Sequence, residues 1–303
     1  MAEPGITEHL SQLTARCREL MGPLLPKRMR AGTPIVPVVR LSGVIGVSAP
    51  LRPGLTLSGA ARMLERAFAV KRAKAVALVL NSPGGSAVQS HLMFRRIRQL
   101  AEEKNLPVIA FVEDVAASGG YMLACAADEI VCDPSSIVGS IGVIGASFGF
   151  HDAIGRLGIE RRVYTSGVNK STLDPFLPEN PDDVARLKAI QHEIHQSFIG
   201  LVKDRRPKLS GPENTMFSGE YWTAKTALGY GLIDRIGDLR SVLRERFGKD
   251  VLTPLVQGER SWFGRPLPGV SRAELADTFG RAGLADEIIA AIEARAIWAR
   301  YGL

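Results

Sequence analysis

The fold is decided by the stretch Val108-Ile109-Ala110-Phe111-Val112-Glu113-Asp114-Val115-Ala116-Ala117-Ser118-Gly119-Gly120-Tyr121-Met122-Leu123-Ala124-Cys125-Ala126-Ala127. Its apolar start, residues 108–112, predicts a β-strand that is buried on both faces. Small residues follow at 116–120, and the two glycines among them allow a sharp turn because glycine has no Cβ. Ser118 stands where the next helix begins, and there unpaired N–H groups and the helix dipole favour negative charge. Ser118 is therefore a candidate nucleophile, with an ordinary N-cap serine as the alternative.

A second unit of the same kind precedes this stretch. Residues 75–80 form another apolar run, followed by the turn Asn81-Ser82-Pro83-Gly84-Gly85-Ser86 and a helix predicted to end near Lys104. Alternating strands and helices predict βαβ units and a parallel sheet with covered faces, whose functional loops lie at the carboxyl ends of the strands. Both glycine-rich turns are expected there. The first turn can present backbone N–H groups to Ser118 as an oxyanion hole does, or it is a helix-entry turn fixed by Pro83.

The rest of the periodicity extends the α/β pattern. It predicts strands near residues 35–45, 129–132 and 161–165, and helices near residues 57–72 and 151–158. Glycine alternates with other residues between 136 and 145, which permits a close backbone approach or a binding edge. No nucleotide-binding glycine motif is present, so phosphate binding is not indicated.

Composition excludes several classes of protein. The 303 residues suit one large domain with extensions or two small domains. The net charge is +7, but the basic residues are dispersed and aromatic residues make up only 6%, so no nucleic-acid binding is expected. Cys17, Cys125 and Cys132 are odd in number and lack metal-ligand spacing. We therefore expect a reducing compartment, no disulfide, no metal and no cofactor, with Cys125 and Cys132 in the core.

A serine nucleophile needs a base, and the histidines are poorly placed for that role. All five fall in or beside helix-like segments: His9, His91, His151, His192 and His195. A Ser-His-Asp triad is not excluded by the order of residues, because that order varies between folds. Lys170 lies in the polar loop 166–172 after a predicted strand. A lysine base would need its pKa lowered from about 10.4 to near 7 or 8 by burial or hydrogen bonding.

The glycine and serine motifs together resemble those of the signal peptide peptidase A family, which are Ser-Lys dyad serine proteases with the Clp protease/crotonase fold. The likeness covers about residues 34 to 247. It is carried by Asn81-Ser82-Pro83-Gly84-Gly85, Ala117-Ser118-Gly119-Gly120-Tyr121, Ser136-Ile137-Val138-Gly139-Ser140-Ile141-Gly142-Val143, Tyr164-Thr165-Ser166-Gly167 with Lys170, Phe217-Ser218-Gly219-Glu220-Tyr221-Trp222-Thr223-Ala224-Lys225-Thr226-Ala227, and Gly231-Leu232-Ile233-Asp234-Arg235-Ile236-Gly237.

This resemblance implies a serine endopeptidase and assigns the site residues. Ser118 matches the nucleophile, Lys170 the general base, and Ser140 the serine that hydrogen-bonds the lysine. The oxyanion hole would use N–H groups of Gly84 or Gly85 together with Gly119. The resemblance also implies peptide or unfolded protein substrates with small or aliphatic side chains, and a homo-oligomeric ring or dome whose substrate pockets are partly shared between protomers.

The two ends of the chain are expected to be extensions. Residues 1–33 contain an amphipathic helix that packs on the body or another subunit, or that lies on an anionic membrane surface. No stretch of 18 apolar residues occurs, so we expect a cytoplasmic protein, with peripheral contact at the inner face of the membrane as the alternative. Residues 34–248 are the predicted protease domain. Residues 249–303 are a predicted linker, to about 270, and two short helices that cover a subunit surface.

Three other functions use related folds or chemistry. A crotonase-type acyl-CoA enzyme would need a carboxylate beside the oxyanion N–H groups, and Glu113 and Asp114 are the only ones just before the Ser118 turn. A catalytically silent scaffold is the second alternative. A capsid-maturation protease of phage origin is the third, and it differs from the main prediction in context alone.

Overall fold

The computed structural model describes residues 32–46, 54–257, 291–292 and 294–303. The predicted N-terminal helix, Cys17 and most of the predicted linker lie outside these ranges. Within them, the chain forms an eight-stranded sheet in the order β6-β5-β3-β2-β1-β8, while β4 pairs with β3 and β7. All pairings are parallel except that of β5 with β6. The α/β prediction is confirmed, and the architecture is consistent with a Clp protease/crotonase-like fold.

The strands are short at the margins of the sheet and long at its centre. They are β1 (Val38–Ser42), β2 (Val76–Ser82), β3 (Val108–Ala117), β4 (Glu129–Cys132), β5 (Ile137–Gly139), β6 (Tyr221–Thr223), β7 (Arg235–Ile236) and β8 (Leu255–Val256). β8 pairs with β1 and lies beyond residue 248, so the sheet extends past the end of the predicted protease domain. Residues 161–165, predicted to be a strand, form none, because they have no strand beside them to pair with.

Alternation along the central strands divides the core into two layers. Leu78 and Leu80 of β2 and Ala110 of β3 face one layer, while Val79 and Phe111 face the other. The helices are α2 (Leu57–Phe68), α3 (Ala87–Lys104), α4 (Gly119–Ala124), α5 (His151–Arg156), α6 (Pro181–Arg205), α7 (Glu213–Met216), α8 (Ala224–Gly229) and α9 (Leu239–Phe247). The first layer is closed by α2, α3, α4 and the end of α6, and the second by α9. Within the described ranges no helix has the length and apolarity that a membrane span requires.

The two glycine-rich turns lie side by side, as predicted. β2 and β3 are parallel neighbours, and Ser82 at the end of β2 is in register with Ala116 near the end of β3. The turns that follow these residues therefore leave the sheet at the same edge. Each leads into a buried helix face, α3 after the first turn and α4 after the second.

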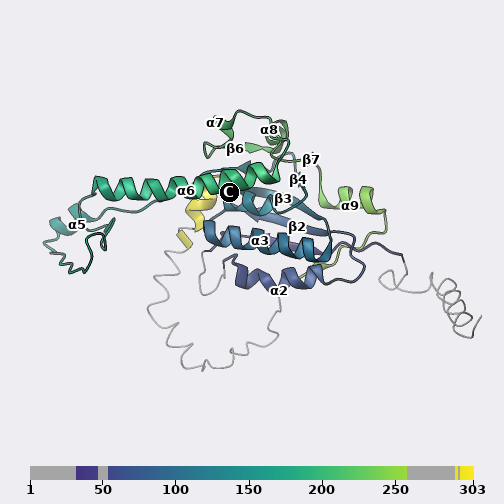
Figure 1. Ribbon diagram of the computed structural model, residues 1–303, viewed down its shortest axis with the longest axis horizontal. Helices are drawn as coiled ribbons and strands as arrows, with labels where there is room; N and C mark the ends of the chain where they lie inside the picture. Colours follow the sequence, from purple (N-terminus) through teal and green to yellow (C-terminus); the bar gives the residue numbers. More distant parts are fainter. Residues whose placement is uncertain (1–31, 47–53, 258–290, 293) are drawn as a thin grey trace, which may run out of the picture.

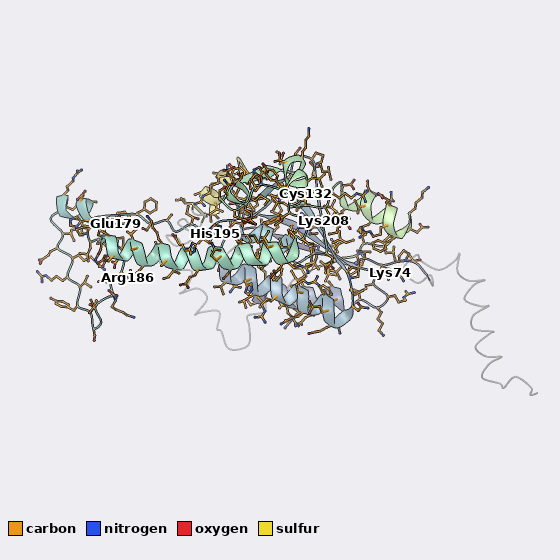
Figure 2. The ribbon with its side chains drawn as sticks, turned by 45° about the horizontal axis from the view of Figure 1, so that its top comes forward. Lys74, Cys132, Glu179, Arg186, His195 and Lys208 are labelled. Atoms are coloured by element: carbon orange, nitrogen blue, oxygen red, sulfur yellow. The ribbon has the colours of Figure 1, made fainter. Side chains whose placement is uncertain are left out.

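A projecting arm, residues 145–190, separates from this body (Figure 1). It consists of α5, the loop that follows and the N-terminal part of α6, which begins at the capping residue Asn180. Arg161 and Asp174 form an ion pair across the loop, and the Arg161 guanidinium lies 5.0 Å from the centre of the Phe176 ring. Figure 2 shows Glu179 and Arg186 toward the tip of the arm and His195 nearer the body. The arm is thus an ordered projection held by its own contacts.

Candidate active site

Ser118 occupies a strand-to-helix turn with an unusual backbone conformation. It follows β3 directly and has φ 52° and ψ −123°, a combination that costs energy for any residue with a side chain. Its N–H donates to the Gly139 carbonyl (2.8 Å), and its own carbonyl accepts from Met122 N (3.0 Å). The half-buried side chain makes no capping hydrogen bond to α4, so it does not act as the N-cap serine that was the alternative. The turn instead presents Oγ at the carboxyl edge of the sheet.

Gly84 of the first turn packs directly against Ser118. A Cβ on Gly84 would lie 2.8 Å from the Ser118 Cβ, 2.8 Å from the Ala117 carbonyl oxygen and 2.9 Å from Gly119 N. The φ of Gly84 is 97°, in the region that favours glycine. The close approach of the two turns therefore depends on glycine at position 84.

Backbone N–H groups border the Ser118 side chain. Gly119 is the first residue of α4, so its N–H has no partner within the helix. The N–H of Gly84 donates to Ser82 Oγ at 3.2 Å, whereas Gly85 is exposed. The structure thus brings Gly84 and Gly119 together beside Ser118, while the adjacent Gly85 packs against the Ile45 backbone. The role of all three in an oxyanion hole stays a prediction.

The helix that follows Ser118 is held firmly at both ends. A Cβ on Gly119 would lie 2.2 Å from Ser90 Oγ, and one on Gly120 would lie 2.4 Å from the Ser82 carbonyl oxygen, so α4 packs against α3 and β2 without side chains between them. Beyond its last turn, Arg205 of α6 donates to the carbonyl oxygens of Cys125 (2.9 Å) and Ala127 (3.0 Å). These contacts fix the helix whose start positions Ser118.

Ser140 lies one residue beyond the carbonyl that holds Ser118. Its φ is 54°, and its N–H donates to the Glu220 carbonyl at 2.6 Å. The preceding residue, Gly139, has φ 112° and touches Trp222 of β6, whose ring would lie 2.8 Å from a Cβ at that position. The antiparallel β5–β6 pair thus sets the position of Ser140 beside the Ser118 turn.

A contact that sequence analysis missed brings the end of the described chain to this site. The Tyr301 hydroxyl lies 3.3 Å from Ser140 Oγ and 3.5 Å from the Pro83 carbonyl oxygen, and the Tyr221 hydroxyl donates to the Arg300 carbonyl at 2.9 Å. Residues 294–299 are helical, as predicted for this part of the C-terminal extension. The segment was expected to cover a subunit surface, and no motif in the sequence indicates that it reaches the turn beside Ser118.

Lys170 lies on the arm, away from Ser118. It belongs to a turn in which its N–H donates to the Gly167 carbonyl (3.2 Å), and its side chain is exposed. Its neighbours Asn169 and Ser171 line a pocket with Glu179 and Arg186, both of which Figure 2 places toward the arm tip. Within one protomer, therefore, the structure brings together Ser118, Ser140 and the glycine turns, but not Lys170.

Other candidate bases near these elements are engaged elsewhere. Among the described histidines, His195 contacts the Ile141 carbonyl at 3.0 Å and His91 stacks on Phe94. Glu113 forms two 2.8 Å hydrogen bonds with Arg40, and Asp114 accepts a 2.6 Å bond from the Asn81 amide. In the described part of the chain, none of these four side chains forms a hydrogen bond with the Ser118 side chain.

A polar cluster that contains the buried Arg206 and the more exposed Asp234 contacts the chain near α4. Arg206 pairs with Asp234 at 2.7 and 2.9 Å, and Tyr121 of α4 donates to the Leu232 carbonyl at 2.7 Å. Burial raises the pKa of Asp234, but the hydrogen bonds from Arg206 and from the Ile130 N–H, together with the charges of Arg206 and Lys208, leave the pKa below its ordinary value. Burial raises the pKa of the Cys125 thiol to about 12 and that of Cys132 further. Both thiols are therefore protonated core groups, as the sequence predicted.

Comparison with known proteins shows that part of the chain is similar to one peptidase family. The model described as peptidase family S49 matches residues 100–248. That range contains Ser118, Gly119, Ser140 and Lys170, while the Gly84–Gly85 turn precedes it.

Three relatives illustrate the likeness. The chain is 53% identical over 94% of its length to a Brucella abortus protein named Na(+)/H(+) antiporter NhaA, of which it covers 39%. It is 33% identical over 70% of its length to the chloroplastic serine protease SPPA of Arabidopsis thaliana, of which it covers 32%. It is 32% identical over 57% of its length to a putative protease of Methanocaldococcus jannaschii, of which it covers 55%. The chain thus spans between about a third and just over half of the length of these relatives.

Proposed function

We propose that the chain is a member of peptidase family S49, whose model matches residues 100–248, and that it is a serine endopeptidase with Ser118 as its nucleophile. The observation that carries the proposal is the Ser118 turn itself. Ser118 has a strained φ of 52°, and its backbone N–H and carbonyl are both hydrogen-bonded. Its side chain makes no capping hydrogen bond, so the hydroxyl is available to act as a nucleophile. The glycine turns beside it supply N–H groups for a developing oxyanion.

The proposed reaction is acyl transfer in two steps. Ser118 Oγ attacks the peptide carbonyl carbon while its proton passes to the neutral amine of Lys170. The N–H groups of Gly119 and of the Gly84–Gly85 turn stabilise the negative oxygen of the tetrahedral intermediate. The C–N bond then breaks as the lysine ammonium returns the proton to the leaving amine, and an acyl-enzyme remains. Water hydrolyses this ester by the same sequence, and Ser140 orients the lysine amine.

Because Lys170 and Ser118 lie apart in one protomer, we place the base on a neighbouring copy. The arm projects beyond its own body (Figure 1), and residues 145–190 expose several large apolar side chains: Phe148, Leu157, Ile159, Tyr164 and Val168. A monomer does not usually expose so many such side chains on one projection. Cyclic assembly would cover them and bring the arm of one copy to the site of the next. Burial of about 800 Å² per partner is enough for a stable contact.

The substrates proposed are peptides or unfolded segments with small or aliphatic side chains. The residues around Ser118 are Ala, Met and Leu, which favour an apolar specificity pocket. We propose no transport function from the name of the Brucella relative. The likeness to that relative runs through the residues that match family S49, and these include the nucleophile turn.

A crotonase-type enzyme fits the site less well. Its chemistry needs a free carboxylate beside the oxyanion N–H groups. Glu113 is paired with the Arg40 guanidinium, and Asp114 accepts a hydrogen bond from the Asn81 amide, so both carboxylates are already engaged with other side chains.

Reaction with a serine-directed fluorophosphonate tests the proposal. We expect one adduct per chain, located on Ser118 by peptide mass spectrometry and absent from Ser118→Ala. Ser58→Ala, which removes an exposed hydroxyl on α2, serves as the control and should label like the wild type. An adduct that persists in Ser118→Ala, or none in the oligomeric wild type, contradicts the proposal.

A further inference from the structure

The end of the described chain is docked on the candidate active site by few but specific contacts. Tyr301 lies between the two loops that flank Ser118, with its hydroxyl 3.3 Å from Ser140 Oγ and 3.5 Å from the Pro83 carbonyl oxygen. Its ring meets the Tyr221 ring edge-on, with centroids 5.0 Å apart at 67°. The Tyr221 hydroxyl also donates to the backbone carbonyl of Arg300 (2.9 Å), directly after the helical residues 294–299.

These contacts hold Tyr301 as a neutral donor. Burial raises the pKa of its hydroxyl above the ordinary value for tyrosine, although the hydrogen bond with Ser140 opposes this. Ile297 and Trp298 of the same segment are half-buried, whereas Leu303 is 42% exposed. The segment is therefore held by the contacts of Tyr301 and Arg300 together with the partial burial of these two side chains.

The position of Tyr301 conflicts with the proposed chemistry. Ser140 is the residue proposed to orient the Lys170 amine, and the Tyr301 hydroxyl already lies at hydrogen-bonding distance from its Oγ. The same hydroxyl lies 3.5 Å from the Pro83 carbonyl oxygen, so Tyr301 spans the two loops that flank the Ser118 turn. A group that approached Ser140 between these loops would have to displace the Tyr301 side chain.

We propose that residues 294–303 form an autoinhibitory cover of the Ser118 site, with Tyr301 as its anchor, and that the cover must leave before Lys170 and substrate enter. This inference rests on the proposed function, because the cover matters only if Ser118 reacts. Displacement exchanges one hydrogen-bond partner of Ser140 for another. The site can therefore be completed by Lys170 of another copy only after residues 294–303 have left it.

Two substitutions in the full chain distinguish the contribution of the Tyr301 hydroxyl from that of its ring. Tyr301→Phe keeps the ring contact with Tyr221 and loses both hydroxyl contacts, whereas Tyr301→Ala loses the ring contact as well. Neutral hydrogen bonds each favour a contact by roughly a factor of two to ten, so we expect fluorophosphonate labelling of Ser118 and peptide hydrolysis to rise several-fold in Tyr301→Phe and more in Tyr301→Ala. A synthetic peptide of residues 294–303 should inhibit Tyr301→Ala competitively. Tyr230→Phe, whose ring packs on Trp222, should behave like the wild type.

Two outcomes would overturn the cover. Unchanged labelling in Tyr301→Ala would mean that Tyr301 does not hinder access, and a fall in both kcat and labelling would make Tyr301 a supporting part of the site. A readout without chemistry keeps this test separate from the proposed function. In a Ser118→Ala background, Tyr301→Ala should speed amide hydrogen exchange in residues 83–85 and 139–141. Unchanged exchange there refutes the cover even if no variant is ever labelled, whereas absent labelling alone counts against the peptidase.

Discussion

A Cβ atom on Gly84 would lie 2.8 Å from the Cβ of Ser118, so the two glycine-rich turns meet at the residue proposed as nucleophile. Gly84 and Ser118 are distant in the sequence, but the parallel pairing of β2 with β3 brings the turns that contain them together. Real Cβ contacts are not this short. The position of Ser118 therefore depends on the absence of a side chain in the neighbouring turn.

Gly84→Ala should reduce peptide hydrolysis by about a hundredfold or more, because displacement of a nucleophile by about 1 Å has an effect of this size. The added methyl group would push against the Ser118 Cβ and the Ala117 carbonyl oxygen. Gly43→Ala is the matched control, since Gly43 has a similar φ of 107° but no atom within 4 Å of an added Cβ. Both variants carry the same backbone strain. Equal loss of kcat/KM in the two would refute steric displacement as the cause.

Lys170→Ala should abolish hydrolysis without loss of structure, because the side chain is exposed on the arm. If the base comes from a neighbouring copy, mixing inactive Lys170→Ala with inactive Ser118→Ala should restore activity after subunit exchange, since mixed oligomers contain intact pairs. Lys188→Ala, on α6, is the control and should stay active. Near-normal kcat in Lys170→Ala would refute the base assignment. Light scattering that gives a monomeric mass for the active protein would refute the shared site.

Ser140→Ala should lower kcat by about one to three powers of ten, because a hydrogen bond that orients a neutral lysine is worth roughly 0.5–1.5 kcal/mol and more when its partner is left unsatisfied. The pH–rate profile should also move, since the same bond acts on the group proposed to take the Ser118 proton. Ser140→Ala also removes the hydrogen bond between Ser140 and Tyr301, which should weaken the proposed cover and raise the rate. The substitution is therefore best made in the Tyr301→Phe background, where that bond is already absent. An unchanged rate and pH profile would leave Ser140 with a structural role alone.

Asp234→Asn should destabilise the protein by about 3 kcal/mol, because it leaves the buried Arg206 without its charged partner. The pKa of Asp234 is depressed in the folded state. Its contribution to stability is therefore fully present above the unfolded pKa of about 3.9 and is lost as the pH falls through the lower folded value. In thermal unfolding between pH 6 and 2, the melting temperature of the variant should fall less with decreasing pH than that of the wild type. Glu160→Gln, at an exposed pair with Arg162, should change little.

Cys125 and Cys132 should not react with a thiol reagent at pH 8 while the protein is folded, because both are buried and their pKa values are raised by burial. A native Cys17→Ser protein should give no reaction, and two thiols should react after denaturation in guanidinium. Fast reaction of a native thiol in this variant would show that α4 opens, and would contradict the rigid support described for Ser118.

Much of the fold and part of the site can be predicted from sequence because they depend on local patterns. Buried runs such as residues 75–80 and 108–112 identify central strands, and alternating strands and helices imply a parallel sheet. The turn chemistry of Gly84 and of Ser118 then predicts both loops of the site and the edge where they meet. The length of β3, which runs on to Ala117, is not predicted, because small residues are compatible with both strand and turn.

Tertiary structure alone decides where Lys170 and Tyr301 lie. Nothing local in residues 161–172 distinguishes a strand inside the domain from a loop on a projecting arm, and the structure has the latter. Likewise, Tyr301 meets Ser140 161 residues away in the chain, through a contact made by one hydroxyl and one ring. Sequence periodicity records which face of an element is buried, but not which distant segment covers it. That choice is made by the path of the chain and by the shape of the surfaces left open once the sheet has formed.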